Sequence, residues 1–209
     1  MGFRERTYSG DKGRLRLPVL IDTDSPIYES SAKNKRTDFA IRWSHYFDEF
    51  EVALSHFSGT SREPRLMPST KKLNHLTPYY EKINQTGLEA LYLIGGLALK
   101  LEAIRRSGQG DTFSAATAGF EYTQVGIADS RIDLGWILEA NHDDRLSSSP
   151  FVVGTRLTFN DTFDSQILSG MFINEKTEEI GSAYITYENV IGLFVLEERI
   201  EKLKKIIIF

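Results

Sequence analysis

The sequence predicts an all-β protein, an antiparallel up-and-down transmembrane β-barrel of about 12 strands. Three observations lead to this prediction. Apolar and polar residues alternate with a period of two along most of the 209 residues, which is typical of strands with one apolar and one wet face. Charges recur in the middle of the wet face. Long and short connections also alternate roughly along the chain, as in membrane barrels, which have short turns at one end and longer loops at the other.

The predicted strands are the segments in which the alternation is continuous. In the clearest one, Leu134, Trp136 and Leu138 alternate with Asp133 and Glu139. The full set, in order, is residues 13–21, 39–43, 50–57, 87–94, 97–103, 113–122, 132–140, 151–159, 165–173, 180–187, 190–196 and 202–209. This count is even, as single-chain bacterial barrels require, provided that residues 197–202 connect the last two strands.

Two segments also fit a helix. Residues 196–208 would suit an amphipathic helix, and residues 72–83 could hold a short helical turn. A soluble β-sandwich or a lipocalin-like binding module remains an alternative, because its charged face would simply contact water.

We expect one β-barrel domain over residues 1–209, since no linker divides the chain. Within it, residues 1–12 are predicted to be a flexible N-terminus. Residues 59–85 are polar and contain three prolines, and they are predicted to form a long external loop.

Composition excludes several classes of function. The net charge of −4 and the pI of about 5.6 give no basic excess for nucleic acid. The absence of cysteine excludes disulfides and thiolate metal sites, and no metal or cofactor is predicted. The longest apolar run, residues 90–99, is far shorter than the ~20 residues of a spanning helix. The first residues are charged and do not form a signal peptide, so the chain is either cytoplasmic or lacks a leader.

Charged residues on the wet face are the candidate lining of a barrel interior. Six are acidic and three are basic, which would favour cations over anions in a water-filled lumen. These residues are Arg42, Glu51, Glu89, Lys100, Glu102, Glu121, Asp133, Glu139 and Arg156. Cross-strand pairing of the same charges would instead close the interior, and a barrel of this size permits either an open or a plugged state.

No catalytic residue is assigned, but one loop is a candidate. Residues 141–145 group His142 with Asp143 and Asp144 at the end of a strand. Such a group could activate water in a barrel hydrolase or bind Ca²⁺ through its carboxylates. An ordinary polar loop is the competing interpretation. The other histidines show no metal spacing and are predicted to be hydrogen-bonded, and "SGQGD" (107–111) lacks the lysine of a phosphate loop.

Aromatic residues support the membrane interpretation. Trp43, Tyr46, Phe47 and Phe50 gather around one short turn, where an interfacial girdle would lie. Strand propensity alone would also place aromatic residues in such segments.

The chain ends in "KKIIIF" and thereby resembles Gram-negative outer-membrane β-barrel proteins. Leu203, Ile207 and Phe209 match their terminal assembly signal, while Lys205 breaks the alternation. The segments "RWSHYFDEFEVALSHFSGTSREPRL" and "KLEAIRRSGQGDTFSAATAGFEYTQVG" are similar to a group of uncharacterised proteins of this kind.

The resemblance implies a location in the bacterial outer membrane and contact with the lipid bilayer and lipopolysaccharide. It also implies recognition by the barrel-assembly machinery, and a mature or N-terminally truncated form. The expected function is a passive pore for small solutes or a structural envelope protein, with no enzymatic activity.

Overall fold

The computed structural model describes residues 3–10, 12–14, 17–174, 179–191, 194–202 and 206–207. The described chain is all-β apart from two short 3-10 turns, η1 (Lys33–Lys35) and η2 (Ile127–Asp129). No helix within these ranges is long and apolar enough to cross a bilayer. The strands form a large sheet and a small sheet.

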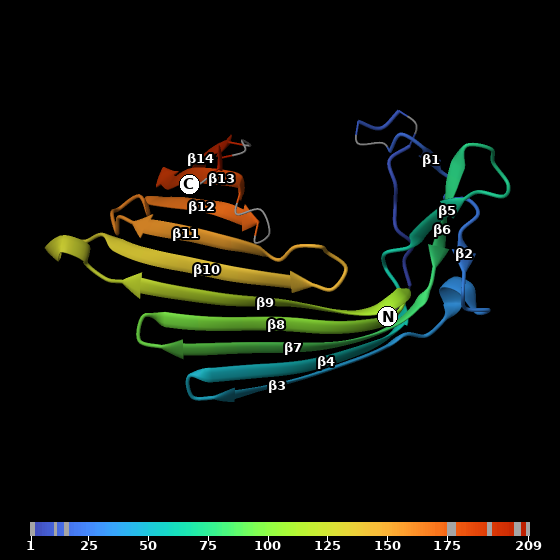
Figure 1. Ribbon diagram of the computed structural model, residues 1–209, viewed down its shortest axis with the longest axis horizontal. Coiled ribbons are helices and arrows are strands. Elements are labelled where there is room, and N and C mark those ends of the chain that lie inside the picture. Colours follow the sequence, from blue (N-terminus) through green and yellow to red (C-terminus); the bar gives the residue numbers. More distant parts are fainter. Residues whose placement is uncertain are drawn as a thin grey trace. The chain divides into compact units, whose positions relative to one another are not determined.

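The large sheet contains 11 strands in the described residues (Figure 1). Its strands are β3 (Phe39–Phe47), β4 (Phe50–Thr60), β7 (Lys82–Ile94), β8 (Leu97–Gly108), β9 (Gly110–Gln124), β10 (Asp133–Asp143), β11 (Pro150–Thr158), β12 (Gln166–Asn174), β13 (Glu179–Ile191), β14 (Phe194–Lys202) and β15 (Ile206–Ile207). The order is β14-β13-β12-β11-β10-β9-β8-β7-β4-β3, and β15 also pairs with β13. The antiparallel up-and-down arrangement predicted from the alternation is therefore confirmed.

Closure of this sheet is not found in the described residues. No pairing joins β3 to β14, so these two strands are its edges. The predicted strand 13–21 is wrong as a member of the large sheet. Of its described residues, only Leu20–Ile21 form a strand, β1, and β1 belongs to the small sheet. Pro18 lies just before it and has no backbone N–H to donate to a ladder.

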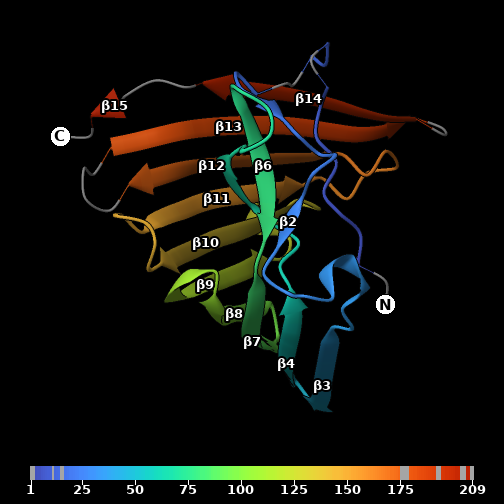
Figure 2. The ribbon, with the colours of Figure 1, turned by 90° about the vertical axis from the view of Figure 1, so that its right-hand side faces the viewer.

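The small sheet is built around β6 (His75–Tyr80). Strands β1 and β2 (Ile27–Tyr28) pair with β6 in parallel, and β5 (Arg65–Pro68) pairs with it antiparallel (Figure 2). The segment 59–85, expected to be a long loop, thus contains β5 and β6 and the start of β7. The helical turn considered for residues 72–83 is absent, because residues 75–80 are extended.

The strands of the large sheet are longer than the alternation predicted. The predicted strands 97–103 and 113–122 leave residues 105–111 outside any strand, but β8 and β9 continue through these residues to a tight turn at Gln109. Gly108 and Gly110 make this turn with φ of +107° and +78°. A Cβ on Gly108 would also overlap the Lys82 carbonyl oxygen, so glycine is required there.

The sequence predicts short turns at one end of the sheet and longer loops at the other, and the connections do not follow this prediction. The end with the short turns 48–49 and 95–96 also carries the longer loops 125–132 and 159–165. Two of the connections at the opposite end are the one-residue turn at Gln109 and the loop 144–149.

The C-terminal region also differs from its prediction. Residues 197–202, expected to connect two strands, lie inside β14, and residues 196–202 are extended and not helical. Ile207, part of the expected assembly signal, lies in β15 and pairs with Glu179. Leu203 and Phe209 lie outside the described residues, so the signal stays a prediction.

The chain divides into two compact units. The first comprises Met1–Trp43, Ser55–Thr86 and Arg105–Phe113, and the second comprises Ser44–Leu54, Gly87–Ile104 and Ser114–Phe209. The first unit contains the buried apolar residues Tyr80, Ile83 and Phe113. Among the described residues of the second unit, Ala53 alone is a buried apolar residue. The described part of the second unit therefore has almost no hydrophobic core of its own.

A buried carboxylate in the first unit makes its stability dependent on pH. Asp22 is 2% exposed, and its Oδ1 accepts a hydrogen bond of 2.8 Å from Lys72 Nζ. This hydrogen bond lowers the pKa of Asp22, although burial opposes the shift. A depressed pKa in the folded state gives stability that is present above the unfolded value, near 4, and is lost as the pH falls through the folded value.

We therefore expect Asp22→Asn to destabilise the first unit at pH 7, with a gap to the parent protein that narrows below about pH 4. Hydrogen exchange of β6 amides at pH 7 and pH 3 measures this gap. A gap that stays constant across this range would contradict the assigned role of Asp22.

Candidate functional site

The second unit presents two chemically different sheet faces. In the antiparallel ladders, Leu138 lies opposite both Phe120 and Val153, and Trp136 lies opposite Tyr122. Directly opposed residues share a face, so these side chains form one surface, which we call the apolar face. Its large exposed members in this unit include Phe50, Leu54, Ile94, Leu99, Leu101, Phe120, Tyr122, Trp136, Leu138, Val153 and Ile185.

Two aliphatic hydroxyl groups lie on the apolar face, and they satisfy each other. Thr155 and Ser169 are directly opposed on β11 and β12, and their oxygens are 2.9 Å apart. A polar group next to an apolar medium costs free energy unless it is hydrogen-bonded. This pair leaves the face apolar in its outward chemistry.

The opposite face of the same strands carries the charges. Two neighbouring hollows, of about 220 and 100 Å³, are lined by six of the nine charged residues predicted to share an interior. Lys100 and Glu102 border both hollows. We call these six residues the acidic wall: Glu51, Glu89, Lys100, Glu102, Glu121 and Glu139. The structure thus brings together side chains from β4, β7, β8, β9 and β10.

Lys100 is the one base in this set of six. Its Nζ lies 2.6 Å from Glu121 Oε1, and both side chains are substantially exposed. Glu139 takes a neutral partner instead, accepting a 3.0 Å hydrogen bond from Asn141 Nδ2. Asn141 Oδ1 accepts a second hydrogen bond, of 2.7 Å, from Thr117. The acidic wall thus has five carboxylates and one ammonium group.

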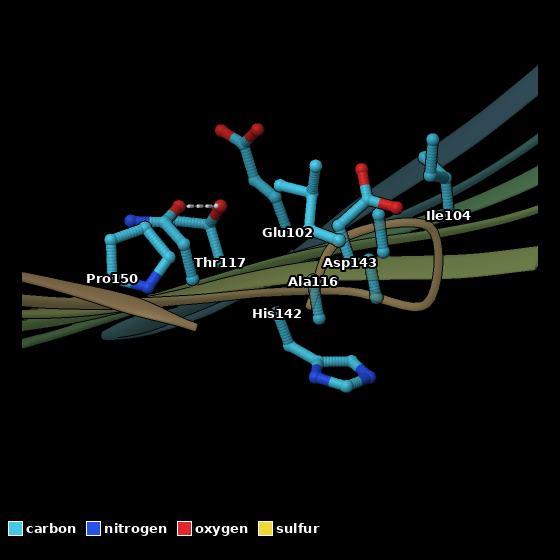
Figure 3. A pocket seen from close by; sticks show the side chains of 11 residues that line it. Glu102, Ile104, Ala116, Thr117, His142, Asp143 and Pro150 are labelled. Carbon is cyan, nitrogen blue, oxygen red and sulfur yellow. Dashed lines mark hydrogen bonds between the residues drawn. The ribbon is translucent and has the colours of Figure 1, made fainter. Parts of the chain in front are cut away.

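A larger hollow of about 330 Å³ extends the acidic wall toward the loop 144–149. Figure 3 shows Glu102, Asp143 and Ile104 on one side of the sheet, together with Thr117. Glu102 borders this hollow as well as the two others, so it stands where all three meet. The sequence did not single out Thr117 or Ile104, because small or neutral residues on a wet face carry no distinctive signal.

The other three predicted charges lie outside these hollows. Asp133 accepts hydrogen bonds of 2.8 Å from Gly126 N and from Asn160 Nδ2, and so holds the loop before β10. Arg156 lies opposite Gly135 on the charged side of β11. Arg42 lies on the edge strand β3. Asp133 is therefore a structural residue.

In the 141–145 candidate, residues that are adjacent in sequence do not pair with each other in the structure. Asp143 holds Arg145 through both oxygens, at 2.9 and 2.6 Å, so a cation already occupies its carboxylate. Figure 3 shows the His142 ring on the opposite side of the sheet from Asp143. Successive residues of a strand point to opposite faces, which excludes direct contact of this pair in β10. His142 Nε2 instead lies 3.0 Å from Asp144 Oδ1.

The remaining candidates are structural. His56 Nδ1 lies 3.0 Å from Thr86 Oγ1, as expected of a hydrogen-bonded histidine, and the His45 ring packs on Phe47 at 4.3 Å. The "SGQGD" segment forms the β8–β9 turn. Within the described part of the chain, no group of three or more His, Asp or Glu side chains is placed to hold a metal ion.

Comparisons with known proteins give no match to a protein-family model, a curated protein or a solved structure. The function is therefore inferred from the chemistry of the two faces.

Proposed function

We propose that this protein is an integral β-barrel of the bacterial outer membrane that acts as a passive, cation-preferring pore. The observation that carries the proposal is the exposed apolar face of the second unit. Soluble monomers rarely expose continuous apolar patches of more than a few hundred Å². Here large apolar side chains are exposed from β4 to β13. Lipid is the medium in which such a surface is stable, and lipopolysaccharide is its outer-leaflet contact.

Strand length supports the same proposal. A strand that crosses a bilayer needs about 9–11 residues, whereas an ordinary strand has about 5–6. The shortest strands on the path from β14 to β3 have 9 residues, and β9 has 15. Each of these strands is long enough to span a hydrocarbon core.

Closure of the barrel would follow from the strand order. The path from β14 to β3 has an even number of strands that alternate in direction, so β3 and β14 run antiparallel. Pairing of these two edges would close the sheet, remove its unpaired backbone groups and put the acidic wall inside. A barrel of about ten strands is narrow, so its solutes would be small.

Aromatic residues gather near one end of the large sheet. The Phe47 and Phe50 rings lie 6.4 Å apart beside the turn 48–49, and Tyr122 and Trp136 are opposed near the loop 125–132. Aromatic rings are favoured at the boundary between lipid and water. We assign this end to one membrane interface.

The first test is the physical state of the protein. A folded membrane barrel needs detergent to stay dispersed, and it migrates faster in an unheated gel sample than in a boiled one. A protein that stays monomeric without detergent would refute membrane insertion and favour the soluble binding module. Folded protein that gives no conductance in a planar bilayer would refute the pore and leave a structural envelope role.

Lys100 is expected to limit the cation preference of the pore. Replacing it with glutamate turns a wall of five carboxylates and one ammonium group into one of six carboxylates. Because rings of acidic side chains favour cations, Lys100→Glu should raise the K⁺ to Cl⁻ permeability ratio several-fold. Reversal potentials in a salt gradient measure this ratio.

Lys71→Glu is the matched control for this measurement. Lys71 lies in the turn between β5 and β6, where its Nζ contacts Ser25, and it is not one of the six residues of the acidic wall. It makes the same change in net charge and should leave the reversal potential unchanged. Equal shifts in the two variants would mean that overall charge, and not the acidic wall, sets the selectivity.

A further inference from the structure

A nucleophile, a base and a carboxylate lie together at the end of β10. Ser149 Oγ is 3.5 Å from His142 Nδ1, and His142 Nε2 is 3.0 Å from Asp144 Oδ1. His142 lies near the end of β10, and Asp144 and Ser149 lie in the loop 144–149 that follows it. Sequence order suggested Asp143 as readily as Asp144, and it gave no reason to choose Ser149 from the run Ser147–Ser149.

We infer that Ser149, His142 and Asp144 form a hydrolytic site for carboxylic esters with an apolar acyl chain. The order of contacts is that of a serine–histidine–carboxylate triad, with the roles of the two ring nitrogens exchanged. A triad is recognised by geometry and roles, and the distance between serine and base is often loose before substrate binds.

Asp144 is held in place by a second contact. Its Oδ2 accepts a 2.7 Å hydrogen bond from the backbone N–H of Ser114 on β9. Together with the contact to His142, this bond lowers the pKa of Asp144, so the carboxylate is ionised at neutral pH. An ionised Asp144 favours the proton of His142 on Nε2 and leaves Nδ1 free to accept the proton of Ser149.

The position of His142 defines the acyl group. His142 continues the row Trp136, Leu138 and Ala140 along β10, and Figure 3 shows its ring turned away from Glu102 and Asp143. A substrate carbonyl at Ser149 would therefore have an apolar surface beside it for a hydrocarbon chain. The His142 side chain is 62% exposed, so substrate can reach it directly.

The chemical step is an ordinary acyl transfer to water. Ser149 Oγ bonds to the ester carbonyl carbon while its proton passes to His142 Nδ1. The bond from that carbon to the alcohol oxygen breaks, and the alcohol leaves with the proton from His142. Water then attacks the acyl carbon of the acyl–Ser149 ester and gives a proton to Nδ1. The bond from that carbon to Ser149 Oγ breaks, and Oγ takes the proton back from Nδ1. The products are the free acid and the restored serine.

The test uses the full chain in detergent with two probes, p-nitrophenyl butyrate and a fluorophosphonate that labels active serines. We expect ester hydrolysis and labelling of Ser149, both lost in Ser149→Ala. His142→Ala should lower the rate by about 10²–10⁴-fold. The matched control is Ser147→Ala, which removes another serine hydroxyl from the same loop. It should change neither readout.

Absence of both hydrolysis and labelling in folded parent protein would overturn the inference, as would hydrolysis that survives Ser149→Ala. Because the butyrate ester is soluble, the assay does not depend on insertion or conductance. Failure of the hydrolytic site is therefore distinguishable from failure of the pore. Phospholipid micelles as a second substrate show whether the ester belongs to a lipid.

Discussion

Replacing Val153 with arginine is expected to lower the free energy of unfolding from lipid vesicles by about 2–4 kcal/mol. Val153 lies in the middle of β11 on the apolar face, opposite Leu138, and is 37% exposed. If this face contacts hydrocarbon, the guanidinium must lose its hydration or distort the bilayer. If the face contacts water, the same change should stay within about 0.5 kcal/mol.

The neighbouring residue provides a matched control. Val152 points to the other face and lies opposite Glu139, so an arginine there would meet a carboxylate on the charged face. Val152→Arg should therefore be nearly neutral. Denaturant titration followed by the fluorescence of Trp43 and Trp136 measures both variants. Equal losses in the two variants would contradict the assignment of the apolar face to lipid.

The period-two pattern predicts the large sheet well because one face is almost continuously apolar and the charges lie on the other. Residues 97–103 alternate cleanly and lie in β8, and residues 165–173 coincide almost completely with β12. The alternation stops at residues 105–111 because arginine, serine and glycine dominate them. In the structure Arg106 packs over the Phe113 ring at 5.7 Å and donates a hydrogen bond to Gln85, so polar contacts keep that segment extended.

The small sheet could not be predicted from alternation. Strands of two residues, such as β1 and β2, are too short to show a period. The central strand β6 contains Pro78, which argues against a central strand because it cannot donate to a ladder. Its pairing depends on contacts far apart in sequence, and a local pattern does not record them.

The sequence predicts which charged residues share one face of the sheet, but not which of them become neighbours. Alternation put nine charges on one face, but register decides which of them become neighbours. Glu121 and Glu139 come together because Glu139 pairs with Gly119, next but one to Glu121 on β9. Asp133 obeys the same alternation, yet its carboxylate is used by the loop before β10. Register and loop closure are properties of the folded chain, so the sequence alone did not separate these cases.

The largest loss within the first unit is expected from Tyr80→Ala, at about 3–5 kcal/mol. Tyr80 is 1% exposed, and its ring lies 5.2 Å from both Phe3 and Tyr28. Its hydroxyl also accepts a hydrogen bond of 2.9 Å from the backbone N–H of Arg6. Truncation would leave a cavity between three chain segments and remove the partner of that amide.

Tyr79→Ala tests whether this loss comes from burial or from any change in β6. Tyr79 is only half-buried and packs under the Arg65 guanidinium at 5.7 Å, so its loss should cost much less. Hydrogen exchange should show the amides of β5 and β6 unprotected in Tyr80→Ala, while β10 and β11 keep their protection. This outcome is expected because the described part of the second unit is held by ladder pairing and has almost no core. Loss of protection in both units together would show that they fold as one cooperative body.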